Sequence, residues 1–303
     1  MSAVLSLQPS YYEALKRLTL ELAGVNLGAN HMFLIETRLS TLARKEGYKS
    51  LEAMIADLFG QGQARLALRV VSALLERDTH FNADPKGIDM IRQHVLPDII
   101  QTLQDDVLNI LSFGCNSGQD AYSVAIMIEN YREKWPNLNF NVTGIDYPSP
   151  ALDRAIKGEY THFEVQRGLP IRDLIKHFEH RQEDWIVKAG LRSRITFKEY
   201  HLLSNLAELG KFHLVIFRNE LPHYASAAQI RVLRSLSTVV EPEGFLILGS
   251  KDIVPKATYG LKPHFDMPFI LKKDAAFVEP EEIIPERVKG PEAVPFVPDS
   301  NFG

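Results

Sequence analysis

The stretch Val107–Ser123 reads VLNILSFGCNSGQDAYS, and its pattern decides the fold. An apolar run at 107–113 ends in a loop bounded by Gly114 and Gly118, and an apolar-periodic segment begins at Gln119. This order predicts a buried strand, a tight turn and the N-terminus of a helix. Because glycine carries no side chain, the backbone of such a turn can approach a ligand closely. The turn is therefore the first candidate for a binding site.

Helices and strands alternate after this turn. Helices are predicted at 119–131, from Ser149-Pro150 to Gly158, at 171–178, and around Ile230, Leu233 and Leu236. Strands are predicted at 140–145, 212–217 and 245–248, and two shorter strands at 185–188 and 194–197 are expected to pair around Ala189-Gly190. The alternation is typical of an α/β fold, in which helices cover both faces of a mostly parallel sheet.

The segments that flank this region follow other patterns. Residues 1–78 predict four short helices with apolar faces, which indicates a small helical domain. A connector and linker helix are expected at 79–104, with the helix ending at Pro97 and restarting behind it. The α/β domain is expected at 105–275, and the Pro- and Glu-rich residues 276–303 predict a disordered tail.

Basic side chains on the predicted N-terminal helices leave two interpretations open. They include Arg38, Arg44, Lys45, Arg65 and Arg69. Charge on the outer face of a helix is usual and indicates a solvated surface. A basic face can also attract an acidic partner helix.

Composition excludes several classes of protein. The 303 residues carry a net charge of -4, which indicates no overall attraction to nucleic acid. A single cysteine, Cys115, excludes an internal disulfide and fits a reducing compartment. No run approaches the roughly 18 apolar residues of a membrane span, the N-terminus does not resemble a signal peptide, and no His or Cys spacing indicates a metal site. We expect a cytoplasmic protein with no metal.

Polar or glycine-rich sequence follows three of the predicted strands, at Gly114–Gly118, at Asp146 and at Arg218-Asn219. In an open α/β sheet, ligands bind beyond the carboxyl ends of the strands, where Asp146 could accept hydrogen bonds from ribose hydroxyls. The turn lacks both the G-x-G-x-x-G and the P-loop pattern, and Asp120 would repel a phosphate. The turn therefore suits a cationic or neutral ligand, and S-adenosylmethionine is such a ligand, because it carries a sulfonium, an adenine and a ribose but no phosphate. The alternative is a structural turn in which Asp120 favours the helix dipole.

Four segments resemble, in their sequence, order and spacing, motifs of the CheR-type chemoreceptor methyltransferases. The resemblance covers about Tyr11 to Asp274. Residues 114–123, GCNSGQDAYS, resemble the family's G-C-S-x-G-E-E-P-Y-S, and residues 77–83 resemble N-x-T-x-F-F-R. Residues 218–224 resemble R-N-V-x-I-Y-F, and residues 244–249 resemble G-F-x-x-x-G. The resemblance implies a Rossmann-like S-adenosylmethionine-dependent methyltransferase domain, a small all-α N-terminal domain and a small antiparallel β-subdomain at about 181–199.

The resemblance also implies a site and a partner. The implied cofactor contacts are Thr79, Gly114, Gly118, Asp120, Asp146, His201, Leu202, Arg218 and Asn219. The implied catalytic residues are Arg218, His223 and Tyr224. The implied reaction methylates glutamate carboxylates of a chemoreceptor-like protein in chemotaxis signalling, with the basic N-terminal helices and the β-subdomain holding the receptor.

Departures from the family pattern gather on the methyl-acceptor side. Ala83 stands where the family has an arginine near the transferred methyl group. His223 stands where the family pattern R-N-V-x-I-Y-F has its tyrosine. Without an arginine at Ala83, another cation is needed to position the acceptor, and Arg77 and Arg218 are the candidates. Three hypotheses follow: an active glutamate O-methyltransferase, a sensor or scaffold that binds S-adenosylmethionine or its demethylated product without turnover, and a methyltransferase for a non-receptor substrate.

Overall fold

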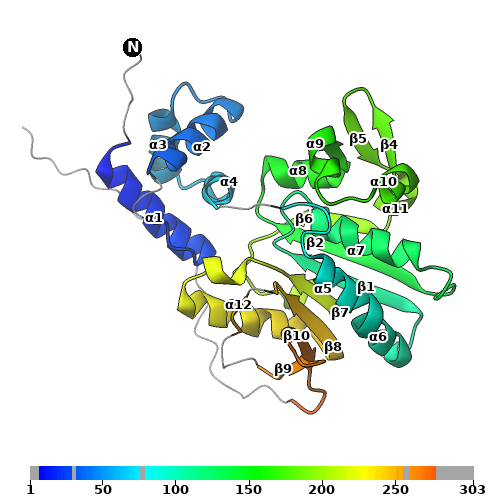
Figure 1. Ribbon diagram of the computed structural model, residues 1–303. Coiled ribbons are helices and arrows are strands. Elements are labelled where there is room, and N and C mark those ends of the chain that lie inside the picture. The colour runs from blue at the N-terminus through cyan, green and yellow to red at the C-terminus, as the bar shows by residue number, and fades with distance from the viewer. Residues whose placement is uncertain (1–6, 29–31, 76–78, 251, 255–258, 278–303) are drawn as a thin grey trace, which may run out of the picture. The chain divides into compact units, whose positions relative to one another are not determined.

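A computed structural model describes residues 7–28, 32–75, 79–250, 252–254 and 259–277 (Figure 1). The described residues divide into two compact units, the first ending at Leu75 and the second beginning at Thr79. The tail expected at 276–303 lies outside the described residues from 278 onward.

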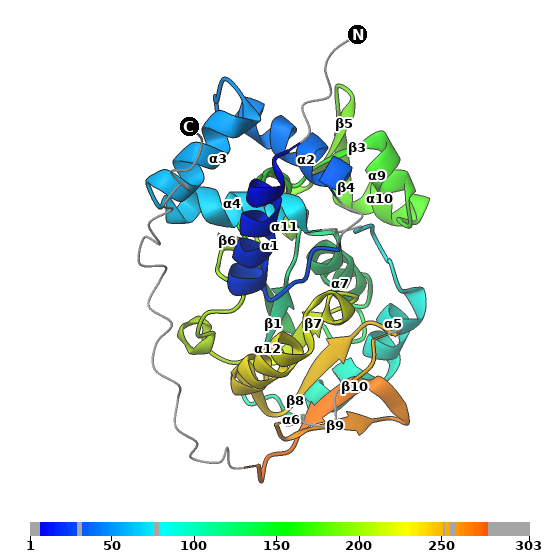
Figure 2. The ribbon, with the colours of Figure 1, turned by 90° about the vertical axis from the view of Figure 1, so that its left-hand side faces the viewer.

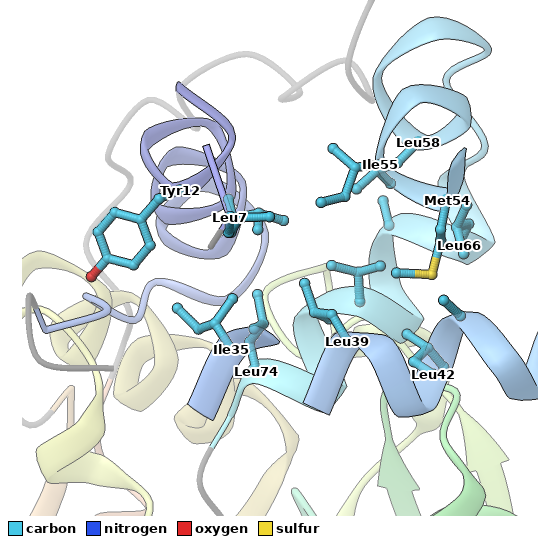
Figure 3. Packing of buried hydrophobic residues seen from close by; sticks show 14 of the residues in the cluster. Leu7, Tyr12, Ile35, Leu39, Leu42, Met54, Ile55, Leu58, Leu66 and Leu74 are labelled. Atoms are coloured by element: carbon cyan, nitrogen blue, oxygen red, sulfur yellow. The ribbon is translucent and has the colours of Figure 1, made fainter. Parts of the chain in front are cut away.

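The described part of the first unit consists of helices α1 (Pro9–Ala23), α2 (Met32–Lys45), α3 (Leu51–Gly60) and α4 (Ala64–Leu74). Ser50 caps α3 by accepting a hydrogen bond from the Ala53 N–H at 3.2 Å. Figure 3 shows the side chains of these helices meeting in one core, in which Leu39, Met54 and Ile55 are fully buried. The prediction of a small all-α domain is confirmed.

Two of the basic side chains in this unit, Arg38 and Arg69, bind groups of the unit itself. The Arg38 Nη1 donates to the carbonyl oxygen of Leu74 at 3.1 Å, which ties α2 to the end of α4. Arg69 pairs with Glu46 at 2.6 Å. These two cations therefore stabilise the domain, and the docking role of the basic surface stays a prediction.

The second unit is built on a seven-stranded sheet (Figure 1). Its strand order is β6 (Ile195–Glu199), β2 (Asn139–Asp146), β1 (Val107–Phe113), β7 (Phe212–Phe217), β8 (Val240–Leu248), β10 (Met267–Lys273) and β9 (Leu261–His264). The strands from β6 to β8 pair in parallel, and β10 and β9 extend the edge antiparallel. The chain leaves β1 toward β2 and later returns to its other side as β7, which makes β1 the switch point where such sheets bind ligands.

Helices of the second unit follow the predicted alternation. The longer ones are α7 (Gln119–Asn130), α8 (Pro150–Lys157) and α12 (Ser226–Val239), which pack on β2, β6 and β8 respectively. Ser149 caps α8 through the Leu152 N–H at 3.1 Å, and Gly158 ends it in a left-handed conformation, as predicted. The shorter helices are α9 (His162–Gln166), α10 (Ile171–His177), α11 (Ala189–Arg192), η3 (Ala207–Leu209) and η4 (Leu221–His223).

The linker helix does not end at Pro97, contrary to the prediction. Helices α5 (Pro85–Met90), η2 (Ile91–Val95) and α6 (Leu96–Thr102) follow one another directly, and η2 is a π-helical turn. In this turn the Leu96 N–H donates to the carbonyl oxygen of Ile91, five residues back. A proline clashes with the carbonyl four residues before it in a regular helix. The wider turn accommodates Pro97, so the chain stays helical.

The expected pairing of residues 185–188 with 194–197 is wrong. A small antiparallel sheet is present (Figure 2), but its strand order is β3 (Glu159–Thr161), β5 (Asp184–Val187) and β4 (Phe178–Arg181). Residues 189–192 form the helical turn α11 instead of a hairpin turn. The next strand, β6, then pairs in parallel with β2 and belongs to the large sheet. The small sheet therefore spans 159–187 rather than 181–199.

Candidate active site

The glycine turn joins the carboxyl ends of β1 and β2. The N–H groups of Gly114 and Cys115 both donate to the carbonyl oxygen of Ile145, at 2.9 and 3.0 Å. Gly114 has a left-handed backbone (φ 67°), and a Cβ added there would come no closer than 3.8 Å to Glu220 and 3.9 Å to Leu202. The space over the Gly114 backbone therefore admits a carbon atom in ordinary van der Waals contact with these two side chains.

Gly118 is required by packing. It precedes α7 with a φ of 85°, and an added Cβ would lie 2.9 Å from both Ala155 in α8 and Phe197 in β6. The space next to Gly118 is thus filled by neighbouring side chains of the protein. Its predicted contact with a cofactor stays a prediction.

Asp146 holds the glycine turn from the end of β2. Its side chain is buried, with the residue only 1% exposed. One carboxylate oxygen accepts from the Asn116 N–H at 2.6 Å, and the other accepts from the Tyr147 N–H at 2.6 Å. Its contact with the ribose hydroxyls of a cofactor stays a prediction. Asp146 thus has a structural role that the sequence did not reveal, beside its predicted contact.

Thr79 fixes the connector to the same turn. Its hydroxyl lies 3.2 Å from the Ser117 hydroxyl and donates to the Gln119 side-chain carbonyl at 3.1 Å. The Tyr160 hydroxyl donates to the Ser117 carbonyl oxygen at 2.6 Å from the other side. Sequence reasoning found Thr79 but missed Ser117 and Tyr160, because their partners are distant in the chain.

The connector is anchored again directly after Thr79. The Phe81 ring is fully buried in an edge-to-face arrangement, with centroids 5.0 Å from Tyr160 and 5.6 Å from Phe178. The Asn82 side chain donates to the Gly168 carbonyl oxygen at 3.0 Å. A Cβ added at Gly168 would overlap the Phe81 carbonyl oxygen, so the two backbones are in direct contact. The connector therefore links the glycine turn to the small sheet.

Arg218 and Asp120 form a buried ion pair across the switch point. The Arg218 Nη2 and Nε donate to the two Asp120 carboxylate oxygens at 2.7 and 3.2 Å. The Arg218 side chain is only 1% exposed, and that of Asp120 is 22% exposed. The Arg218 Nη1 is buried and has no hydrogen-bond partner within the described part of the chain. The two predicted cofactor residues are thus brought together, and one donor remains available.

Asn219 and Asp252 lie beside this ion pair. Asn219 adopts a left-handed φ of 59°, and its N–H donates to the Asp252 carboxylate at 3.1 Å. The same carboxylate oxygen accepts from the Gly249 N–H at 2.7 Å. Burial raises the pKa of the Asp252 carboxyl above its ordinary value. Asp252 therefore fixes the carboxyl ends of β7 and β8, a role that sequence reasoning did not assign.

His201 and Leu202 follow β6 near the glycine turn. Leu202 is fully buried, and the His201 ring meets the Tyr147 ring edge to face at 5.8 Å. Burial lowers the pKa of His201, so the imidazole is neutral at pH 7. Its Nδ1 is buried without a hydrogen-bond partner among the described residues. A neutral imidazole nitrogen can serve a nucleobase as donor or acceptor, depending on the tautomer.

The two residues predicted beside the acceptor differ in position. His223 is exposed at the end of η4. Tyr224 is 6% exposed and packs against Phe217 with ring centroids 6.0 Å apart. The burial of Tyr224 favours a packing role, and its predicted catalytic role stays a prediction.

A cavity of about 710 Å³ opens at the carboxyl ends of β7 and β8. Its described lining residues are Ala83, Asp84, Pro85, Lys86, Asn219, Pro222, Ser250 and Asp252. Volumes of this size are usual for small-molecule sites. Sequence reasoning named Ala83 and Asn219 but missed Lys86. The helix-start signal Asp84-Pro85 could have indicated that Lys86 stands on a helix at this edge.

The residues at the switch point fit S-adenosylmethionine. Gly114 leaves room at the backbone, and His201 and Arg218 carry buried nitrogen atoms without described partners. Asp120 disfavours a phosphate at the start of α7, which excludes the usual dinucleotide arrangement. These features define the class of Rossmann-like methyltransferases.

The comparisons identify the family within this class. Residues 77–266 match the family model for the CheR methyltransferase, SAM binding domain. Chemotaxis protein methyltransferase 1 of Pseudomonas aeruginosa is 30% identical over 250 residues, 80% of this chain and 89% of that protein. Chemotaxis protein methyltransferase Cher2 of Pseudomonas putida is 29% identical over 248 residues, with the same coverage of 80% and 89%. The chain belongs to the CheR methyltransferase family, and its cofactor is S-adenosylmethionine.

Within the described ranges, no helix combines the length and the apolar composition that crossing a bilayer requires. The same residues contain no group of three or more His, Cys, Asp or Glu side chains that could hold a metal ion.

Proposed function

We propose that the protein transfers the methyl group of S-adenosylmethionine to glutamate carboxylates of a chemoreceptor-like protein. The observation that carries this proposal is the cavity beside Asn219, because the preceding residue, Arg218, pairs with Asp120 in the helix that follows the glycine turn. The names of the two Pseudomonas relatives support a chemotaxis substrate. The single cysteine, Cys115, supports a cytoplasmic location.

The cofactor supplies an electrophilic methyl group bound to a sulfonium sulfur. We assign its binding to Thr79, Gly114, Asp120, Asp146, His201, Leu202, Arg218 and Asn219, which border the turn and the ends of β2, β6 and β7. A glutamate is already ionised near neutral pH, so its attack needs no general base. The residues therefore act by holding and aligning the two reactants and by excluding water.

The partner is held by other surfaces in this proposal. We assign receptor docking to the basic helices of the first unit and to the small sheet of 159–187. The exposed side chains of Phe163, Ile171 and Ile175, next to this small sheet, support that assignment. Ile171 and Ile175 stand four residues apart in α10 and therefore share one face of that helix.

A second candidate function is cofactor binding without turnover. It is favoured by the cavity wall at Ala83, where a small apolar side chain leaves the acceptor without the expected guanidinium. In this case the chain acts as a sensor or scaffold for S-adenosylmethionine or its demethylated product.

Two measurements on the full-length protein distinguish these functions. Calorimetry measures S-adenosylmethionine binding, and radiolabelled methyl transfer to the chemoreceptors of the source organism measures base-labile ester. The Asp146→Ala variant is expected to lose both, whereas the exposed Asp153→Ala on α8 keeps both. Binding without ester on any receptor would favour the second function, and absence of binding would contradict both.

A further inference from the structure

The described lining of the cavity beside Asn219 has two carboxylates, those of Asp84 and Asp252, and one ammonium group, that of Lys86. The Asp84 carboxylate caps α5 by accepting from the Gly87 N–H at 3.1 Å, and Asp252 accepts from Asn219 and Gly249. These hydrogen bonds keep both acidic side chains in place at the cavity wall. A substrate carboxylate that enters would be repelled by them unless a cation faces it.

Two arginines, Arg77 and Arg218, are the candidate cations for positioning the acceptor. Arg77 lies outside the described residues. Arg218 is 1% exposed at its side chain, and two of its three nitrogens bind Asp120. Its remaining Nη1 points toward α5, because it lies 3.7 Å from the position of a Cβ added at Gly87. Arg218 is therefore committed to the buried side of the site.

Lys86 is the only positively charged side chain among the described residues that line the cavity. It is exposed and has no ion-pair partner among those residues. It stands in the first turn of α5, where the helix dipole disfavours a cation. Helix stability therefore does not account for a lysine at this position.

We propose that Lys86 binds the carboxylate of the acceptor glutamate in the cavity beside Asn219. This inference rests on the proposed function and assigns the acceptor side of the same site. The ammonium donates charge-assisted hydrogen bonds to the carboxylate and offsets the charges of Asp84 and Asp252. The flexible stem of lysine lets the ammonium reach across the cavity, while the small side chain of Ala83 leaves room for the glutamate.

The first test measures receptor methylation by four proteins: wild type, Lys86→Ala, Lys86→Arg and Lys134→Ala. Lys134 is also exposed but lies in the loop between α7 and the amino end of β2, whereas the cavity opens at the carboxyl ends of β7 and β8. Loss of a charge-assisted hydrogen bond is expected to raise the KM for the receptor about 30-fold in Lys86→Ala. Lys86→Arg keeps the charge and recovers most of the loss, and Lys134→Ala matches wild type. Calorimetry should give the same S-adenosylmethionine affinity for all four.

The second test does not depend on turnover. Each full-length protein, loaded with S-adenosylhomocysteine, is titrated with N-acetyl-glutamate N-methylamide, and binding is detected by saturation-transfer NMR. The expected result is binding to wild type and Lys86→Arg and loss in Lys86→Ala. Lysine-dependent probe binding without ester on any receptor would contradict the proposed function and support the role of Lys86. Equal probe binding in wild type and Lys86→Ala, or none in wild type, would overturn the role of Lys86.

Discussion

Replacing Gly168 by alanine tests whether the connector is held against the small sheet as described. Gly168 has a φ of 94°, a conformation that side chains other than glycine disfavour. An added Cβ would overlap the Phe81 carbonyl oxygen, which is backbone and cannot rotate away. The substitution therefore combines backbone strain with a clash against the connector.

The chain provides a matched control for the strain alone. Gly210 has a similar φ of 87°, but an added Cβ there would meet nothing within 4 Å. A residue other than glycine in such a sparsely populated backbone region costs about 1–3 kcal/mol, and overpacking adds about 1–3 kcal/mol. We expect Gly210→Ala to lose about 1–3 kcal/mol of unfolding free energy from backbone strain alone, and Gly168→Ala about 2–6 kcal/mol. Gly190→Ala, with an ordinary φ and open space in α11, should be neutral.

Thermal unfolding and calorimetry measure the two consequences. A loss of 1 kcal/mol lowers Tm by roughly 2–4 °C in a domain of this size, so Gly168→Ala should melt clearly below Gly210→Ala. Because the displaced connector carries Thr79, the affinity for S-adenosylmethionine should also fall about tenfold, the equivalent of one hydrogen bond. Equal melting temperatures for the two variants would refute the contact between Gly168 and Phe81.

Three further predictions concern the site. Arg218→Met leaves the partly exposed Asp120 carboxylate without its partner and should lower the free energy of unfolding, measured in urea, by about 3 kcal/mol. A decrease below about 1 kcal/mol, the usual contribution of a surface pair, would contradict a buried pair. Tyr160→Phe removes the donor to the Ser117 carbonyl and should cost about 1–2 kcal/mol, and an unchanged urea midpoint would show that this bond contributes nothing. Burial raises the pKa of the Asp252 carboxyl in the folded state above the ordinary value of 3.8. As the pH rises above 3.8, ionisation of this carboxyl therefore favours the unfolded state and lowers the free energy of unfolding. Asp252→Asn keeps an oxygen acceptor without titrating, so its unfolding free energy relative to wild type should increase from pH 4 to pH 7; a pH-independent difference would refute this.

Local signals explain which elements could be predicted. The start and end of α8 follow from Ser149-Pro150 and Gly158, because a cap, a proline and a left-handed glycine act within a few residues. The strand character of 194–197 was also recognised, but its partner was not. Pairing with β2 depends on where the chain returns in space, and α11 between 187 and 195 has no strong sequence signal.

At the site, too, local signals could be predicted and contacts made by the folded chain could not. The glycine turn, Asp146 and Arg218 follow strands directly, and ligand sites gather at such strand ends. The cavity instead combines residues 83–86 with 219–222 and 250–252, whose contact depends on the folded sheet. The π-helical turn before Pro97 was equally hidden, because a proline in a helical pattern ordinarily indicates a break.

The path of the connector determines where the catalytic unit can be separated from the rest of the chain. A fragment that begins at β1 would contain the whole sheet but would lack the Phe81 ring, which packs against Tyr160 and Phe178. It would also lack Thr79 and Lys86. A fragment that keeps the Phe81 anchor therefore begins upstream of Thr79, and a recombination event that exchanges N-terminal helical domains must cut the gene before that codon to preserve the anchor.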